Sequence, residues 1–128
     1  MVQAIIIDSS IYLSVLLRDS EYNNAIKMLA PYLDDVNCVI YLPTIVISEV
    51  INVLARYKGK NSEINFFISQ TIGLNKFEIV HPDVMFYYKE IKANTENIDI
   101  KTSDLIIYSI AKKYNVDKIL TLDKQLSK

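Results

Sequence analysis

The chain has 128 residues, 51% of them hydrophobic, and 14 basic and 15 acidic side chains give a formal net charge of −1. This length is typical of one domain with a sizeable buried core. Two glycines exclude Gly-rich phosphate-binding loops, and the single cysteine, Cys38, excludes both a disulfide framework and a zinc site built on cysteines. The single histidine, His81, excludes a His–His metal motif, and the near-neutral charge indicates no general basic coat for nucleic acid.

The N-terminal sequence MVQAIIID has no basic flank, and its apolar run ends at Asp8 after four residues. It is therefore too short for a signal peptide or a membrane span. We expect a cytoplasmic protein, and the lone thiol agrees with a reducing compartment.

Short apolar runs alternate with helical patterns along the chain. An all-apolar run is typical of a buried parallel strand, and apolar residues three and four positions apart indicate an amphipathic helix. The alternation predicts a single α/β domain over residues 1–128, with three layers (α/β/α) around a central, mostly parallel sheet of four to five strands. The predicted strands are 4–7, 38–42, 77–80 and 118–122. The predicted helices are 9–17, 21–33, 44–57, 61–72, 83–93 and 102–114, with a last turn from 123.

Four acids stand in apolar surroundings, where carboxylates are seldom found unless they are paired or bind metal. Asp8 ends the first predicted strand and Asp123 ends the last, whereas Glu49 lies inside an apolar helical pattern and Asp104 begins another. The carboxyl ends of parallel strands meet at one edge of a sheet, where the sites of such folds lie. Carboxylates gathered there would repel one another, and a divalent cation that prefers oxygen ligands, Mg²⁺ or Mn²⁺, would relieve this repulsion.

Each acid also has a purely structural interpretation. Asp8 and Asp123 could cap the helical turns that follow them, and Asp104 could be a favourable charge in the first turn of its helix. Glu49 could form an ion pair with Arg56, seven residues further along. A single shared site explains all four positions together.

Three segments resemble the PIN domain, most closely the single-domain VapC type of toxin nuclease. They are IIIDSSIYLSVLL, LPTIVISEVINVLARY and TSDLIIYSIAKKYNVDKILTLDKQL. The resemblance implies a PIN-like nuclease fold, and it assigns the catalytic and metal-binding roles to Asp8, Glu49, Asp104 and Asp123.

Smaller positions complete the comparison. Ser10 and Thr121 match small polar positions near the metals of the family, although turn or cap chemistry would also explain them. Leu126 stands where many relatives have an aromatic residue. Many relatives also continue into a fifth strand beyond the position of Lys128, so we expect the sheet edge near Asp123 to differ.

The resemblance implies a metal-dependent endoribonuclease that uses Mg²⁺ or Mn²⁺ and is the toxin of a toxin–antitoxin pair. Such a site needs neither histidine nor a reactive thiol, in agreement with the composition. Two alternatives stay open, a PIN-like scaffold that binds without catalysis and a housekeeping RNA-processing nuclease. A phosphoacceptor receiver domain is disfavoured, because Asp8 stands alone after the first strand and His81 ends the third.

Basic residues that flank the predicted site segments are candidate contacts for substrate phosphates. They are Arg18, Lys101 and Lys124. Lys112 and Lys113 are further candidates, although this pair is more typical of a solvated helix face. The segments INFFI at 64–68 and VMFYY at 84–88 carry more apolar bulk than a small core needs, which predicts a homodimer surface or an antitoxin groove. The expected partners are thus RNA, a second copy of the chain and a small antitoxin protein, with no membrane.

Overall fold

A four-stranded sheet forms the centre of the computed structural model, which describes residues 3–57, 59–92 and 102–123. The strand order is β3-β2-β1-β4, and each neighbouring pair of strands is parallel. This confirms the predicted sheet. The strands are β1 (Gln3–Ile7), β2 (Cys38–Pro43), β3 (Phe77–Val80) and β4 (Lys118–Leu120). The predictions for Lys101, Lys124 and Leu126 lie outside the described residues.

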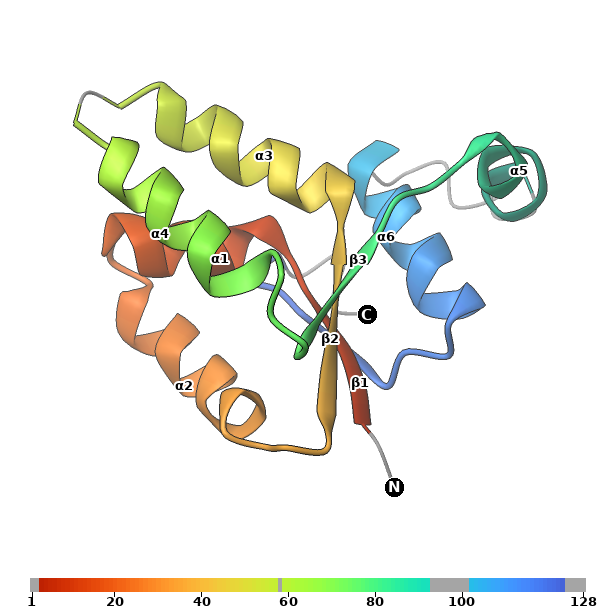
Figure 1. The fold of residues 1–128 in the computed structure, drawn as a ribbon, viewed down its shortest axis with the longest axis horizontal. Helices are drawn as coiled ribbons and strands as arrows, with labels where there is room; N and C mark the ends of the chain where they lie inside the picture. Colours follow the sequence, from red (N-terminus) through yellow and green to blue (C-terminus); the bar gives the residue numbers. More distant parts are fainter. Residues whose placement is uncertain (1–2, 58, 93–101, 124–128) are drawn as a thin grey trace.

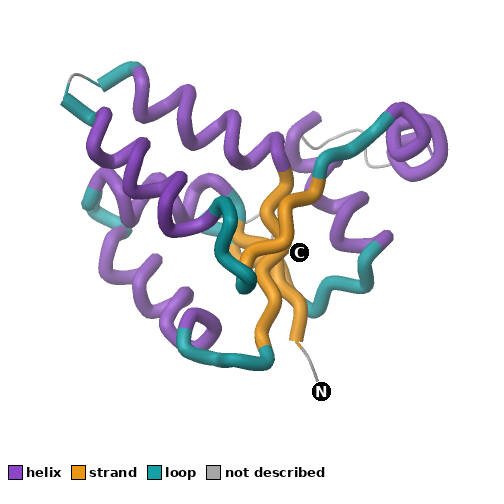
Figure 2. Tube along the Cα trace, in the orientation of Figure 1, coloured by secondary structure: helices purple, strands orange, loops and turns teal. Residues whose placement is uncertain are grey.

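Helices cover both faces of the sheet, which confirms the predicted three layers (Figures 1 and 2). One face carries four helices, namely α1 (Ser9–Leu17), α2 (Tyr22–Leu33), α3 (Thr44–Ala55) and α4 (Asn61–Thr71). The other face carries α6 (Thr102–Lys113), together with the short α5 (Val84–Phe86) and the π-helix η1 (Tyr87–Ile91) that follows it.

The core is centred on β1, whose residues Ile5, Ile6 and Ile7 are almost completely buried. β1 lies between β2 and β4 and has helices on both faces, so its side chains are buried whichever way they point. This explains why its apolar run does not alternate with polar residues. Among the described residues, no helix has the length and apolar character that crossing a bilayer requires.

The segment predicted as one helix over 83–93 differs most from expectation. Asp83 accepts a hydrogen bond from the Phe86 backbone N–H at 2.8 Å and so caps α5, but α5 continues as the π-helix η1. The apolar side chains of Val84 and Tyr88 are exposed instead of forming a core face. An apolar helical pattern therefore does not define a regular amphipathic helix here.

The last strand, β4, ends at Leu120 and is thus shorter than the predicted 118–122. The Thr121 side chain accepts a hydrogen bond from the backbone N–H of Asp123 at 2.9 Å, which turns the chain away from the sheet. The remaining predicted strands and helices agree with the structure to within two residues at each end, and the predicted last turn from 123 extends outside the described residues.

Candidate active site

β1 and β4 end side by side at the edge formed by the carboxyl ends of the strands, here called the carboxyl rim. Ile7 pairs with Leu120, and the backbone N–H of Asp8 donates to the carbonyl oxygen of Leu120 at 2.9 Å. The residues that follow these two strands, Asp8 and Thr121, are therefore neighbours at this rim. Ligand and active sites of parallel sheets lie at such an edge.

The Asp8 carboxylate is held by two hydroxyl groups. Thr121 Oγ1 donates to Asp8 Oδ2 at 2.9 Å, and Ser10 Oγ donates to the same oxygen at 3.0 Å. Each hydroxyl in turn accepts a backbone N–H, from Asp123 to Thr121 at 2.9 Å and from Leu122 to Ser10 at 3.0 Å. Because a hydroxyl has one proton, both chains of hydrogen bonds run in one direction, from amide to hydroxyl to carboxylate.

This network decides between two interpretations of Asp8. Asp8 is the residue before α1, but its side chain makes no capping hydrogen bond to that helix. Helix capping therefore does not explain the carboxylate of Asp8, a residue that is only 6% exposed. Its orientation is instead fixed toward Ser10 and Thr121, at the place where a ligand of a parallel sheet would bind.

Two further acids belong to helices that begin near strand ends. Asp104 lies in the first turn of α6 and is 7% exposed. Glu49 is half-buried, with Oε1 shielded from solvent. It lies five residues after α3 begins at Thr44, or about 7.5 Å along the helix axis, and helical side chains lean toward the N-terminus. Both carboxylates are thus more buried than those of ordinary surface acids.

Asp123 reaches the rim through its backbone. Its N–H is bonded to Thr121, and its side chain is half-buried. The sequence pattern alone does not reveal that the amides of Leu122 and Asp123 are part of the network. The available signal is the spacing of Thr121 and Asp123, which is typical of a turn in which a hydroxyl accepts the N–H two residues on.

The four acids do not form a closed metal cage. Within residues 3–57, 59–92 and 102–123, no three carboxylate, imidazole or thiolate groups are arranged to hold a metal ion. The donor chemistry nevertheless suits Mg²⁺, because the side chains at this rim offer oxygen atoms. Mg²⁺ commonly binds one or two carboxylates and completes its shell with water and substrate phosphates. The residues present therefore fit a Mg²⁺ or Mn²⁺ ion that is loosely held better than one enclosed in a rigid cage.

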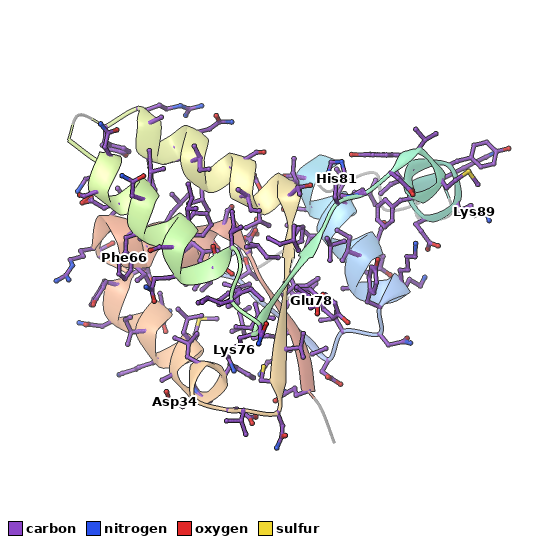
Figure 3. The ribbon with its side chains drawn as sticks, in the orientation of Figure 1. Asp34, Phe66, Lys76, Glu78, His81 and Lys89 are labelled. Atoms are coloured by element: carbon purple, nitrogen blue, oxygen red, sulfur yellow. The ribbon has the colours of Figure 1, made fainter. Side chains whose placement is uncertain are left out.

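Two other residues considered from the sequence lie away from Asp8. Arg18 follows the last residue of α1, so it is at the opposite end of that helix from Asp8, with its guanidinium 5.5 Å from the ring centroid of Tyr22. His81 follows β3, and its Nδ1 lies 3.2 Å from Thr44 Oγ1. Figure 3 shows His81 at the end of β3, and β2 separates this strand from β1.

Comparison with protein families matches residues 5–128 to the PIN domain. The chain therefore belongs to the PIN domain family, a family of nucleases. A comparison with curated proteins gave no match.

Solved structures with the same fold include toxins of the VapC type. VapC20 of Mycobacterium tuberculosis, a toxin that cleaves the sarcin–ricin loop, superimposes with a TM-score of 0.76 at 13% identity, covering 96% of this chain and 92% of that one. VapBC2 of Rickettsia felis, solved with a DNA fragment from its promoter, gives 0.63 at 21% identity, covering 96% and 90%. A toxin–antitoxin complex from Klebsiella pneumoniae gives 0.64 at 16% identity, covering 94% and 88%. At these identities the likeness establishes the fold.

Proposed function

We propose that this protein is a metal-dependent endoribonuclease and the toxin of a toxin–antitoxin pair. The observation that carries the proposal is the buried Asp8 carboxylate, oriented by Ser10 and Thr121 at the carboxyl rim of a PIN-family fold. A carboxylate fixed in this way is suited to holding a cation against a phosphate. The similar solved structures support the toxin role, because they include a toxin that cleaves the sarcin–ricin loop and two toxin–antitoxin complexes.

In the proposed mechanism Asp8 and Asp104 are the principal ligands of Mg²⁺ or Mn²⁺, and Asp123 and Glu49 complete the site or orient water. A bound divalent ion would lower the pKa of water and offset charge on the phosphodiester. The burial of Asp8 and Asp104 strengthens their attraction to a cation, because charges interact more strongly away from bulk water. Ser10 and Thr121 act as positioning residues that keep Asp8 in one orientation.

The chain has an apolar groove of about 390 Å³ between α1, α2 and α4, which is suitable for binding the proposed antitoxin. Three large apolar side chains that line this groove, Leu33, Phe66 and Leu74, are exposed; Figure 3 labels Phe66 on α4. Tyr12 also lines the groove, and its buried hydroxyl has no hydrogen-bond partner among the described residues. We propose that an amphipathic segment of the antitoxin binds here with its apolar side chains.

The experiment that tests the enzymatic proposal is cleavage mapping on total cellular RNA. The purified protein should cut RNA at defined positions in Mg²⁺ or Mn²⁺ and should not cut it in excess chelator. Asp104→Asn should remove the cuts while the protein stays folded by circular dichroism. Identical cuts by Asp104→Asn, or cutting that chelator does not reduce, would contradict the proposal.

A growth assay separates the toxin from a housekeeping nuclease. Expression of the wild-type chain should stop growth, and co-expression of a small DNA-binding protein encoded beside it should restore growth. A housekeeping enzyme would cut RNA in vitro without this arrest. A scaffold without catalysis would show neither cleavage nor a Mn²⁺ site that depends on the acids.

A further inference from the structure

A second groove, of about 670 Å³, runs across the edge of β4. β4 is the last strand of the described sheet, and α2 and α6 lie on opposite faces (Figure 1). Residues of α2, α6 and β4 line this groove, here called the β4 groove. It is distinct from the apolar groove between α1, α2 and α4, because it lies on the other side of α2.

Cations from three separate elements line the β4 groove. They are Lys27 of α2, Lys112 of α6 and Lys118 of β4, and all three side chains are exposed. One acid, Asp117, is among the described lining residues, and its Oδ2 accepts the backbone N–H of Ala4 at 2.8 Å. The positive charge therefore outweighs the negative charge in the groove.

Aromatic rings line the same groove as these cations. Tyr32 of α2 and Tyr108 of α6 line the two walls, and the Lys112 ammonium lies 5.8 Å from the ring centroid of Tyr108. Proteins that bind single-stranded nucleic acid combine a basic groove for the phosphates with aromatic rings on which bases stack. The β4 groove has both components.

The β4 groove shares one residue with the candidate active site. Thr121 lines the groove and also donates the hydrogen bond to Asp8. On α6, Asp104, Tyr108 and Lys112 are spaced by four residues and so lie along one face of the helix. From Asp104 to Lys112 this face is about 12 Å long. One wall of the groove thus leads directly away from a proposed metal ligand.

We propose that the β4 groove binds the single-stranded RNA segment next to the bond that is cut, with phosphates on Lys27, Lys112 and Lys118 and bases against Tyr32 and Tyr108. This inference rests on the proposed ribonuclease function and adds the path of the substrate. An exposed strand edge can also pair with a strand from a protein. Charge favours RNA, because strand pairing uses backbone groups and does not require three lysines from three different elements.

The test measures RNA binding separately from cleavage, by fluorescence anisotropy of a short labelled single-stranded RNA of mixed sequence in excess chelator. The triple variant Lys27→Ala, Lys112→Ala, Lys118→Ala should bind about tenfold or more weakly. Each lost phosphate contact should also reduce the slope of log affinity against log salt concentration by about 0.7. The three side chains are exposed, so the melting temperature should stay close to that of the wild type.

Lys113 provides the matched control on the same helix. Its ammonium lies 5.6 Å from the Phe86 ring centroid and 5.8 Å from that of Tyr114, and it does not line the β4 groove. Lys113→Ala should leave both the affinity and the salt slope unchanged. For stacking, Tyr108→Ala should weaken binding about fivefold or more, whereas Tyr108→Phe should bind like the wild type.

The triple variant binding RNA with wild-type affinity and salt slope would overturn the inference. It would also be overturned if the triple variant kept RNA binding but lost a complex with the neighbouring-frame protein, because the groove would then be a protein site. Cleavage in Mg²⁺ keeps the two proposals apart. If the wild type cleaves RNA and the groove variants bind RNA as the wild type does, only the proposal for the groove is contradicted. If RNA binding depends on the groove but the wild type does not cleave, only the nuclease proposal is contradicted.

Discussion

Thr121 and Asp8, 113 positions apart in the chain, are joined by a hydrogen bond of 2.9 Å from Oγ1 to Oδ2. The bond crosses from the end of β4 to the end of β1, the two strands that complete this side of the sheet. The proposed site therefore forms only when the last strand has paired with the first. Pairing of β4 with β1 is therefore a condition for the proposed site.

Replacing Thr121 by valine should destabilise the protein and slow cleavage. Valine keeps the shape but removes the donor to Asp8 and the acceptor of the Asp123 N–H. Hydrogen bonds to charged groups contribute about 1.5–3 kcal/mol, so the free energy of unfolding should fall by about that amount in urea denaturation. Thr121→Ser keeps the hydroxyl and should recover most of both losses. Equal behaviour of the valine and serine variants would show that the hydroxyl does not position Asp8.

Mg²⁺ or Mn²⁺ should raise the melting temperature of the wild-type protein. At a concentration tenfold above its dissociation constant, a metal that binds only the folded state adds about 1.4 kcal/mol of stability, or about 4–6 °C for a domain of this size. Asp8→Asn should remove this increase. A melting temperature that rises equally in Asp8→Asn would place the metal elsewhere. Differential scanning fluorimetry gives the shift directly.

Tyr12→Phe should reduce the loss of stability at alkaline pH. Burial raises the pKa of the Tyr12 hydroxyl above its usual value of 10.0. Above that value the unfolded chain has released this proton and the folded chain keeps it, so the unfolded state binds fewer protons and stability falls as pH rises. The effect is absent below the usual pKa.

Urea denaturation at about pH 9 and about pH 11 measures this difference, which amounts to about 1.4 kcal/mol per pH unit above the usual pKa. The loss between the two values should be smaller in Tyr12→Phe than in the wild type. Tyr88→Phe, which changes an exposed tyrosine, is the matched control. An equal loss in wild type and Tyr12→Phe would show that Tyr12 ionises in the folded protein as it does in the unfolded chain.

Phe66→Asp should block binding of the proposed antitoxin without unfolding the toxin. Phe66 is 57% exposed, so a surface substitution there changes stability by about 0.5 kcal/mol or less. A carboxylate in the apolar groove would have to be desolvated by the partner, which weakens the complex. Co-purification with the protein encoded in the neighbouring frame measures binding. Val84→Asp on α5, at an exposed position outside this groove, should co-purify like the wild type, and loss in both variants would remove the groove assignment.

The sequence predicts the fold well, because the strands and helices depend on local patterns, whereas the shared site of the four acids stays a prediction. The apolar run of β1 is buried on both faces, and Asp8 follows it directly, so strand and candidate ligand are visible in one segment. Thr121 and Asp123 are visible in the same way after β4. Parallel pairing then places Asp8 and Thr121 at one rim.

The β4 groove could not be predicted, because its cations come from elements that are distant in the sequence. Lys27, Lys112 and Lys118 do not form a sequence motif. Taken by itself, Lys112 is typical of a solvated helix face. Arg18 shows the opposite error, because closeness in the sequence suggested closeness to the site. It is ten residues from Asp8, but α1 carries it to the far end of the helix.

The most direct measurement of carboxylate-dependent RNA hydrolysis compares Asp8→Asn with Asp34→Asn under single-turnover conditions in Mg²⁺, on a short RNA that contains a mapped cleavage site. Asp34 is exposed after α2, on the side of the sheet where β2 begins, and Figure 3 labels it there. Asp8→Asn should lower the cleavage rate about 100-fold or more, because each 1.36 kcal/mol of lost transition-state stabilisation is a factor of ten. Asp34→Asn should cut at the wild-type rate. Wild-type cleavage by Asp8→Asn would contradict the proposed function.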